Sequence, residues 1–324
     1  MAGDAPLLVE AAGREVAITS PAKVYFPERG ETKADLARYY LAVEAPLMAA
    51  VGGRPVMLQR FPDGAGGPGF FQKRVPERRP GWLRTAVVET PNGTPSTALV
   101  LADIAHVLWA VNLGCLGFHV WPSTADDLGH ADELRIDLDP SPGVDFAMVR
   151  DAAVLVRELM VEHGVDARPK TTGNRGIHVY ARLAPRWTSI EVRAAAVAVA
   201  RELERRAPEL VTAAWWKEER GRRVFVDFNQ NATHKTIFGA WSVRSRPGGQ
   251  VSTPFAWADL AGIRPDDLTL VTVPSRVDVA GDPWAGMAGA DLTPLLDLAA
   301  RDRDAGLPDA PWPPVYPKMP GEPP

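Results

Sequence analysis

The sequence has almost no cysteine. Cys115 is the single cysteine among 324 residues, which excludes an intrachain disulfide and a zinc cluster built on cysteines. Long apolar runs are also missing, because no stretch approaches the roughly 20 residues of a membrane-spanning helix. The first residues lack the basic-then-apolar order of a signal peptide. These absences predict a soluble globular protein, which we expect in the cytoplasm at the nucleoid.

The sequence also has no surplus of positive charge. It contains 36 Lys and Arg residues and 40 Asp and Glu residues, which gives a net charge of −4. That balance argues weakly against a protein that binds nucleic acid. Basic residues nevertheless cluster at 73–84, 217–223 and 244–246, and local clusters set the field that a ligand meets. Nucleic acid therefore stays open as a partner.

The stretch from Asp132 to Pro140 alternates polar and apolar residues without a break, which is the period of a strand with one buried face. The apolar side carries Leu134, Ile136 and Leu138, and the polar side carries Glu133, Arg135, Asp137 and Asp139. Carboxylates at i and i+2 lie roughly 6–7 Å apart at their Cα atoms and repel each other, unless a divalent cation lies between them. An edge strand with a solvated acidic face would show the same alternation, so both interpretations stand at this point.

Capping and turn signals predict the helices. Thr32-Lys33-Ala34-Asp35 resembles a capping box and opens a helix that we expect to continue to Gly52-Gly53. Further helices are expected at about 103–113, at 145–163 and in an alanine-rich segment that Thr188 and Glu191 cap. The last twenty residues are rich in proline and are interpreted as a tail that is disordered or ordered on contact.

Two later stretches carry groups that bind phosphates and metals. Residues 172–176 (Thr-Gly-Asn-Arg-Gly) form a tight turn that offers backbone N–H groups, a hydroxyl and a guanidinium, which bind phosphate oxygens. Residues 224–230 are expected to form a strand with Asp227 on the same face as Phe225 and Asn229. Three carboxylates on separate strands can hold two divalent cations about 3.5–4 Å apart. The basic residues that would complete a triphosphate site are Arg220, Arg244 and Arg246.

Two further positions have both a structural and a functional interpretation. Phe70 and Phe71 stand beside Lys73 and Arg74, where aromatic rings can stack bases while the cations hold phosphates. A core strand that buries one of the two phenylalanines is the simpler local interpretation. His119 lies on an expected strand, where a lone histidine is more often structural than a ligand.

Three segments occur in a fixed order. They are Asp137-Leu138-Asp139-Pro140, Lys170-Thr171-Thr172-Gly173-Asn174-Arg175-Gly176-Ile177-His178-Val179-Tyr180 and Val224-Phe225-Val226-Asp227-Phe228-Asn229-Gln230-Asn231. They resemble the three motifs of the archaeo-eukaryotic primase superfamily, and within it the polymerase domains of bacterial DNA ligase D. The similarity also includes Lys23-Val24-Tyr25-Phe26-Pro27, Thr32-Lys33, Phe70-Phe71-Gln72-Lys73 and Asn112-Leu113-Gly114-Cys115-Leu116-Gly117-Phe118-His119-Val120, and it covers about residues 15–290.

The resemblance implies an α+β fold, the archaeo-eukaryotic primase-polymerase fold, with two β-sheets flanked by helices and an RRM-like catalytic core. It divides the chain into an N-terminal lobe at 1–120 for template and 5′-phosphate binding, a catalytic lobe at 121–290 and a proline-rich tail at 291–324. No ligase or phosphoesterase domain follows residue 324 in the sequence, so we expect a stand-alone enzyme that meets its ligase in trans.

The resemblance also implies roles for individual residues. The catalytic ligands of two divalent ions, Mn²⁺ or Mg²⁺, would be Asp137, Asp139 and Asp227. The incoming nucleotide would be held by His119, Thr172, Arg175, Arg220, Gln230, Arg244 and Arg246. DNA would be bound at the template by Phe70 and Phe71, and at a 5′-phosphate by Ser20, Lys23 and Lys33. Helix amides near Thr32 would add donors to that phosphate.

At three of these positions the chain departs from the family pattern. Family members usually have Ser where this chain has Thr172, Lys where it has Arg175, and often Asn where it has Ser20. Thr keeps the hydroxyl and Arg keeps the charge, so the triphosphate site is expected to be retained. Ser is shorter than Asn, which weakens the expected contact of Ser20.

The implied reaction is template-directed transfer of nucleotides, preferably ribonucleotides, to a primer 3′-hydroxyl at DNA gaps or ends in repair by non-homologous end joining. The implied partners are gapped or broken DNA with a 5′-phosphate, nucleoside triphosphates, Ku and a separate DNA ligase, and no membrane. A two-metal nuclease or phosphodiesterase is one alternative, but it leaves the phosphate-binding turn unexplained. A non-catalytic DNA end-bridging module is another, but it has no need for three carboxylates.

Overall fold

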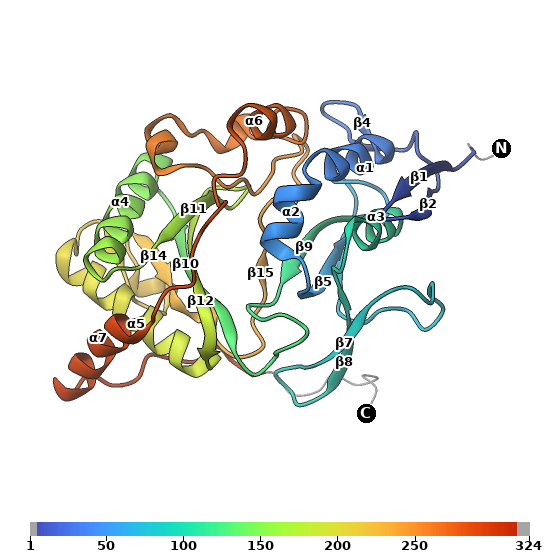
Figure 1. Ribbon diagram of the computed structural model, residues 1–324. Coiled ribbons are helices and arrows are strands. Elements are labelled where there is room, and N and C mark those ends of the chain that lie inside the picture. Colours follow the sequence, from blue (N-terminus) through green and yellow to red (C-terminus); the bar gives the residue numbers. More distant parts are fainter. Residues whose placement is uncertain (1–4, 316–324) are drawn as a thin grey trace.

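The structure, a computed structural model, describes residues 5–315 and contains two large β-sheets with helices packed against them (Figure 1). The five-stranded sheet has the order β11 (Ala167–Thr171), β12 (Ile177–Trp187), β10 (Ala131–Pro140), β14 (Val224–Asp227), β13 (Val211–Thr212). The six-stranded sheet has the order β15 (Ile237–Phe238), β9 (Cys115–Val120), β5 (Pro55–Arg60), β8 (Pro95–Val100), β7 (Thr85–Glu89), and β6 (Phe70–Gln72) also pairs with β5. Two small pairs are β1 (Leu7–Ala11) with β2 (Arg14–Ile18) and β3 (Val24–Phe26) with β4 (Glu31–Thr32). The expected α+β architecture is confirmed.

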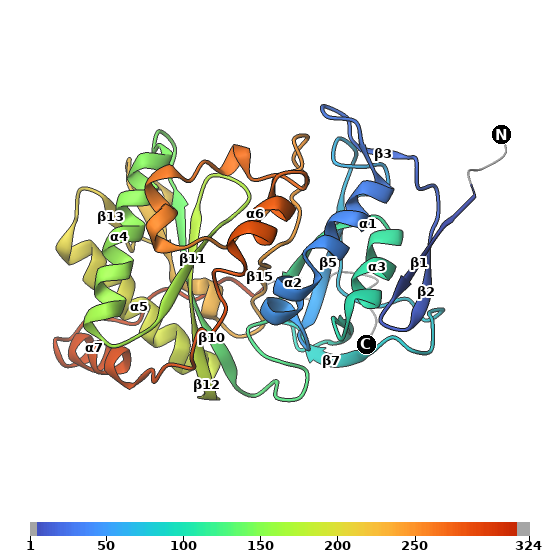
Figure 2. The ribbon, with the colours of Figure 1, turned by 45° about the horizontal axis from the view of Figure 1, so that its top comes forward.

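Helices cover both sheets. They are α1 (Lys33–Ala42), α2 (Glu44–Val51), α3 (Ile104–Asn112), α4 (Phe146–Glu162), α5 (Ser189–Arg206), α6 (Val273–Ala280) and α7 (Thr293–Asp304), with short 3₁₀ turns η1 (Lys217–Glu219), η2 (Phe228–Asn231), η3 (Trp257–Gly262) and η4 (Pro265–Asp267). Figure 2 shows α1, α2 and α3 beside the sheet that contains β5, and α4 and α5 beside the sheet that contains β10. The expected helices at 103–113 and 145–163 are confirmed within one residue at each end, and Thr188 and Glu191 form the expected capping box.

Strand β10 lies in the middle of its sheet, between β12 and β14. Its apolar residues are buried in the core as the alternation predicts. The interpretation as a solvated edge strand is wrong, because β10 is a central strand and Glu133 and Arg135 on its polar face are buried. Arg135 crosses to the other sheet and donates hydrogen bonds to the carbonyls of Val120 and Trp121. The polar side of β10 therefore faces the six-stranded sheet.

A buried ionic cluster joins the two sheets. Glu133 is 3% exposed and lies 2.8 Å from Arg135, 2.8 Å from Arg182 and 3.3 Å from Arg54. Arg54 comes from the loop before β5 and also binds Asp132 through two hydrogen bonds of 2.6 and 2.7 Å. Buried charges of this kind require partners to offset their lost hydration, so this cluster fixes one sheet against the other.

The helix expected from Thr32 to Gly52 is two helices. Thr32 caps α1 through the expected capping box with Asp35, but α1 ends at Ala42 and α2 begins at Glu44. Pro46 explains the break, because its ring has no N–H to donate and would clash with the carbonyl four residues earlier in a continuous helix.

The strand expected at 224–230 ends at Asp227. The Asp227 side chain accepts a hydrogen bond from the Asn229 N–H, which turns the chain into η2. Asn229 is consequently 2% exposed and does not continue the face of Phe225. The expected placement of Asn229 beside Asp227 on one strand is therefore wrong.

The proposed division at residues 120 and 290 stays a prediction. Strand β15 comes from the later part of the sequence and pairs with β9 of the six-stranded sheet. Within 291–324, helix α7 packs against α5, and Ala310 is buried. Part of the expected proline-rich tail, residues 316–324, lies outside the described residues.

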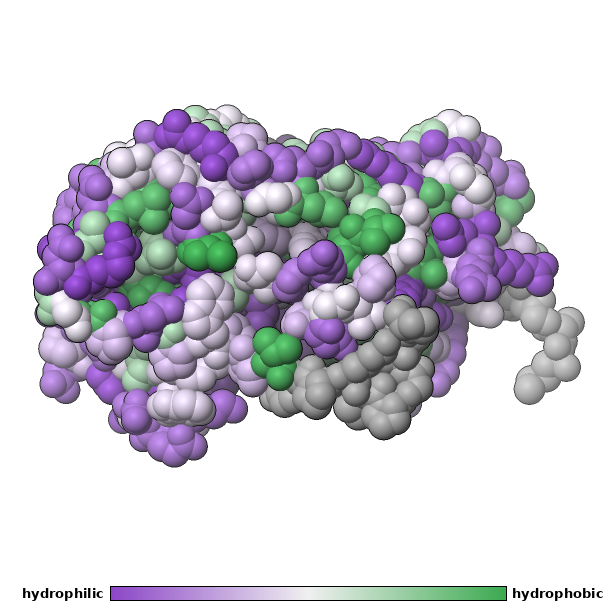
Figure 3. All heavy atoms as spheres, turned by 90° about the horizontal axis from the view of Figure 1, so that it is seen from below, coloured by the Kyte–Doolittle hydropathy of each residue, from purple (hydrophilic) through white to green (hydrophobic). Residues whose placement is uncertain are grey.

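The surface is mixed in character. On the face shown in Figure 3, hydrophobic residues form separate groups among hydrophilic ones. Within the part of the chain that the structure describes, we find no helix with the length and apolarity needed to cross a membrane.

Candidate active site

Neighbouring strands bring the three aspartates together. Asp137 on β10 pairs with Asp227 on β14 and with His178 on β12, and side chains paired across antiparallel strands share a face. Asp139 follows two residues later on that face. One cavity of about 230 Å³ is lined by Asp137, Asp139, Thr172, Asn174, Arg175, Gly176, His178, Asp227, Gln230 and Arg244.

Burial raises the pKa of all three carboxyl groups. The pKa of Asp137 rises to about 6 because of burial, against the attraction of Lys170 and Arg244. Burial and the nearby charge of Asp137 raise the pKa of Asp227 to about 6 and also raise that of Asp139. A cation between these groups would remove much of the cost of ionising them.

The donor set fits divalent cations with oxygen ligands, although protein groups hold the carboxylates in this structure. Asp227 accepts hydrogen bonds from the Asn229 N–H at 2.9 Å and from Gln230 Nε2 at 2.8 Å. His178 Nε2 lies 3.2 Å from Asp137 Oδ1. Across residues 5–315, no three His, Cys, Asp or Glu side chains stand together as a finished coordination shell.

The glycine-rich turn between β11 and β12 is folded around Thr172. The Thr172 hydroxyl accepts hydrogen bonds from the N–H groups of Asn174 and Gly176, both at 3.1 Å. Gly176 is required, because a Cβ there would lie 2.5 Å from the Leu138 carbonyl oxygen of β10. The turn is thus packed against the strand that carries Asp137 and Asp139.

Arg244 lies across this turn. Its Nε donates to the Thr172 carbonyl at 2.7 Å, and its guanidinium carbon lies 3.6 Å from the centre of the Phe238 ring. Burial lowers its pKa to about 10, against the attraction of Asp137. The guanidinium therefore stays charged at neutral pH and faces the carboxylates.

Three of the residues expected to hold the nucleotide do not line this cavity. Arg220 donates to the carbonyls of Ala214 and Trp215, although its charge still lowers the pKa of Asp139 and Asp227. Arg246 pairs with Asp266 at 3.0 Å. His119 lines a neighbouring cavity of about 300 Å³.

His119 is held between aromatic rings. Its ring centre lies 5.1 Å from that of Phe71 and 5.3 Å from that of Phe238. Burial, with smaller effects from Arg244 and nearby cations, lowers its pKa to about 3, so the imidazole is neutral. Its buried Nε2 has no hydrogen-bond partner among the described residues, which leaves that atom for a ligand.

Phe70 and Phe71 are exposed on β6, at 48% and 51%. The interpretation of one of them as a core residue is therefore wrong. The guanidinium carbon of Arg60 lies 5.1 Å from the centre of the Phe70 ring. Two exposed rings beside an arginine form a surface on which bases can stack.

Lys23 and Lys33 are neighbours at the N-terminal end of α1. Lys33 is 5% exposed, and its ammonium donates to the Thr19 carbonyl and to Asn112 Oδ1. Burial, and then repulsion from Lys23, lowers the pKa of Lys33 to about 8. Lys23 is exposed and donates to Asp63 at 2.7 Å. Two cations that repel each other form a place where an anion is stabilised.

The expected donors from the start of α1 are already bonded within the protein. The amides at the start of α1 add no donors, because the N–H groups of Thr32, Lys33, Ala34 and Asp35 already bind Asp35, Lys23, Pro21 and Thr32. Ser20 is exposed with φ 48°.

Sequence reasoning missed two buried residues, His178 in the cavity lining and Lys170, which pairs with it on the next strand. His178 lines the cavity opposite Asp137, and burial, with Lys170 and Arg244, keeps its pKa well below the usual range. Lys170 is fully buried and donates to the Phe238 carbonyl and to Ser252. The alternation in the strand that follows the glycine-rich turn could have found His178, since it places His178 on the same face as Tyr180.

Three acidic side chains, a glycine-rich turn and an arginine in one cavity define a nucleotidyltransferase type of site. Residues 32–284 match the family described as the LigD primase-polymerase domain. The chain is 33% identical over 306 residues to the multifunctional non-homologous end joining protein LigD of Mycolicibacterium smegmatis. The aligned region covers 94% of this chain and 40% of that protein. It is 31% identical over 268 residues to the bifunctional protein LigD of Bacillus subtilis, at 82% and 43% coverage.

A solved structure gives the same result. The polymerase domain of Mycobacterium tuberculosis ligase D, in complex with DNA, matches with a TM-score of 0.79 and 31% identity, over 84% of this chain and 97% of that one. The chain belongs to the LigD primase-polymerase domain family and is thus an enzyme of the nucleotidyltransferase class. It spans about two fifths of the length of the curated relatives it matches.

Proposed function

We propose that the protein adds nucleotides, preferably ribonucleotides, to a primer 3′-hydroxyl at DNA gaps or broken ends during non-homologous end joining. The observation that carries this proposal is the single cavity that holds Asp137, Asp139 and Asp227 opposite the 172–176 turn and Arg244. Names of the relatives support the pathway. Extension of a labelled primer across a gapped duplex, with each nucleotide in turn, tests the proposal.

The chemistry divides between ions and side chains. Two divalent ions, Mn²⁺ or Mg²⁺, held by Asp137, Asp139 and Asp227 would supply activation of the 3′-hydroxyl and neutralisation of the leaving pyrophosphate. The Arg175 guanidinium of the 172–176 turn would bind phosphate oxygens, as would those N–H groups of the turn that are not already bonded to Thr172 or Gly176. Arg244 would stabilise the charge that develops on them. Gln230 would bind the nucleotide from the cavity lining. Arg220 and Arg246 would join when the nucleotide binds, which requires Arg246 to leave Asp266.

DNA would lie over strand β6 of the six-stranded sheet. Phe70 and Phe71 would contact the template bases, as their exposure permits. Ser20, Lys23 and Lys33 would hold the 5′-phosphate on the far side of a gap. Ku and a separate DNA ligase would be the protein partners, and the nucleoid in the cytoplasm would be the place of action.

We expect a preference for ribonucleotides. A 2′-hydroxyl both donates and accepts hydrogen bonds, and a site built to bind it leaves buried polar groups unpaired when it is absent. The unpartnered Nε2 of His119 is one such group. The measurement is kcat/KM for GTP and dGTP opposite template C. Equal values would count decisively against the preference.

We expect tighter binding to a short gap with a 5′-phosphate than to the same gap with a 5′-hydroxyl. Charge-assisted contacts from Lys23 and Lys33 contribute about 1.5–3 kcal/mol, which is roughly a ten- to hundredfold difference in Kd. Fluorescence anisotropy at low and moderate salt measures it.

Changing Lys23 and Lys33 together to Ala should remove the difference between the two gaps. Arg29→Ala is the control, because Arg29 is a cation in the turn between β3 and β4 that pairs with Glu31, and it should keep the difference. Equal binding of both gaps by the wild type would show that the phosphate pocket is absent.

A further inference from the structure

The short turn η2 controls the direction of the Asp227 carboxylate. The backbone N–H of Asn229 donates to Oδ1 at 2.9 Å, and the side chain of Gln230 donates to Oδ2 at 2.8 Å. Both carboxylate oxygens are therefore bonded to the turn that immediately follows β14. Any shift of η2 relative to the sheet would turn the carboxylate.

Two asparagines anchor η2 on opposite sides. Asn231 exchanges hydrogen bonds of 2.9 and 2.6 Å with the backbone of Arg135 in β10. Asn229 is 2% exposed, and its Oδ1 accepts from Arg193 Nε at 2.7 Å while its Nδ2 donates to the Pro311 carbonyl at 3.0 Å. The first anchor is the sheet itself, and the second is remote in sequence.

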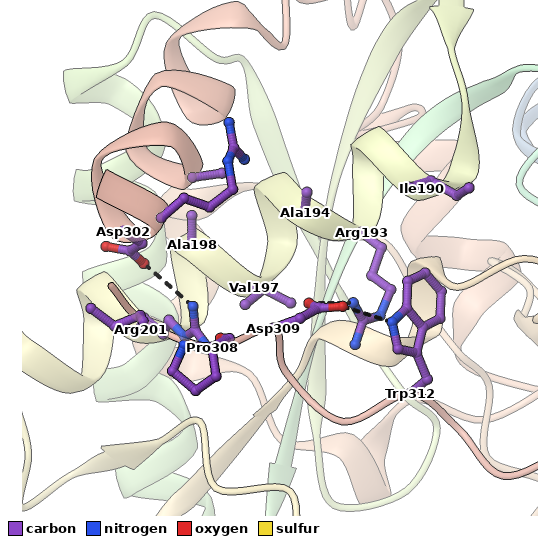
Figure 4. A pocket seen from close by; sticks show the side chains of 13 residues that line it. Ile190, Arg193, Ala194, Val197, Ala198, Arg201, Asp302, Pro308, Asp309 and Trp312 are labelled. Atoms are coloured by element: carbon purple, nitrogen blue, oxygen red, sulfur yellow. Dashed lines mark hydrogen bonds and ion pairs between the residues drawn. The ribbon is translucent and has the colours of Figure 1, made fainter. Parts of the chain in front are cut away.

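Arg193 comes from α5 and is 1% exposed. Its other donors go to the segment 308–312, which we call the C-terminal strap. They bind the carbonyls of Ala310 at 2.8 Å and Pro311 at 3.0 Å, and the Asp309 carboxylate at 3.3 Å. Trp312 covers the guanidinium, with its ring centre 3.7 Å from the guanidinium carbon, as Figure 4 shows from the side of the adjoining cavity.

The arrangement is more specific than packing requires. A buried arginine needs partners for a planar set of five N–H donors, and apolar residues of similar volume would hold a strap on a helix equally well. Here one donor is aimed at the amide oxygen of Asn229, and the strap carbonyls fix the plane of the guanidinium. The direction of the Asn229 side chain is thereby fixed as well.

We propose that Arg193 and Asn229 are positioning residues that hold η2, and through it the Asp227 carboxylate, in place. The C-terminal strap supplies the acceptors that keep Arg193 in its orientation. This inference rests on the proposed function, in which Asp227 is a metal ligand. It adds a connection from the C-terminal end of the described chain to the catalytic carboxylate.

The test compares Arg193→Ala with Arg201→Ala in the full chain. Arg201 lies on the same helix and donates to the Pro308 carbonyl of the same strap, whereas the Asn229 side chain is bonded to Arg193 and Pro311. Arg193→Ala should weaken Mn²⁺ binding, measured by calorimetry without substrate, by about tenfold or more, as loss of a group that orients a metal ligand does. It should also lower kcat for primer extension, with the KM for the nucleotide nearly unchanged. Arg201→Ala should bind Mn²⁺ like the wild type.

Further variants keep the test decisive. Asn229→Ala should reproduce the loss of Mn²⁺ affinity, and Arg193→Lys, which keeps one donor, should recover part of it. If Arg193→Ala does not fold, the Mn²⁺ affinity of Asn229→Ala tests the proposal in its place. Wild-type Mn²⁺ affinity and kcat in Arg193→Ala or Asn229→Ala would overturn the proposal, as would an equal loss in Arg201→Ala, since the effect would then be one of stability. Asp227→Asn distinguishes a failure of the proposed function from a failure of the positioning role. If it retains extension, the proposed function fails, and if it is inactive while Arg193→Ala is normal, only the positioning role fails.

Discussion

Asp227→Asn should lower primer extension by roughly a hundredfold or more, while affinity for DNA stays the same or rises slightly. Asparagine has the shape of aspartate but not its charge, so it removes a candidate metal ligand from β14 and leaves the strand pairing with Asp137 intact. Single-turnover extension at saturating Mn²⁺ measures the loss. A variant with a tenth of the wild-type rate or more would contradict the assignment of Asp227 as a ligand.

The same substitution should stabilise the metal-free protein at neutral pH. Burial and Asp137 raise the pKa of Asp227 in the folded state to about 6, above its value near 4 in the unfolded chain. The contribution of Asp227 to stability is therefore fully present below about pH 4 and is lost as pH rises through about 6. Thermal unfolding should show a higher Tm for Asp227→Asn than for the wild type at pH 7.5, and the difference should shrink by pH 4.5.

Glu133→Gln should destabilise the fold by about 3–5 kcal/mol, because it leaves buried arginines without their shared carboxylate. Arg54, Arg135 and Arg182 all lie within 3.3 Å of Glu133. Urea unfolding measures the loss. Glu162→Gln is the control, because Glu162 pairs with Arg206 on the surface, where an ion pair adds little. A loss no larger than that of the control would show that the cluster does not hold the sheets together.

The pH dependence of this cluster has the opposite sign to that of Asp227. Burial alone would raise the pKa of Glu133, but the three arginines lower it to about 2. Its contribution to stability is therefore present above about pH 4.5, its ordinary value, and is lost as pH falls through about 2. Glu133→Gln should accordingly unfold like the wild type only in strong acid.

Local patterns in the sequence predict most of the site. The alternation around Asp137 predicts the strand and its core face, and the resemblance to primase motifs brings in Asp227 and the 172–176 turn. The two aspartates are about ninety residues apart, and only the pairing of β10 with β14 shows that they are direct neighbours. Alternation records which residues share a face, but it does not record what covers that face, which is why the burial of Glu133 was not foreseen.

The missed features depend on contacts between distant segments. Pro46 was a visible signal for the break between α1 and α2, and a capping interaction explains why β14 stops at Asp227. The link from Asn229 through Arg193 to Pro311 joins three segments that no local pattern connects. The exposure of Phe70 and Phe71 likewise follows from the position of β6 at a sheet edge, beyond β5.

The central claim is that this cavity performs template-directed nucleotide addition. The most direct measurement is extension of a labelled primer across a gapped duplex by the wild type, with each of the four ribonucleotides alone, with and without Mn²⁺. The account predicts metal-dependent addition of only the nucleotide that is complementary to the template base, and roughly a hundredfold less of it or lower still in Asp227→Asn. Shortening of the primer without nucleotide would identify a nuclease instead. Binding of the duplex with neither extension nor shortening would identify an end-bridging protein, and either result would contradict the claim.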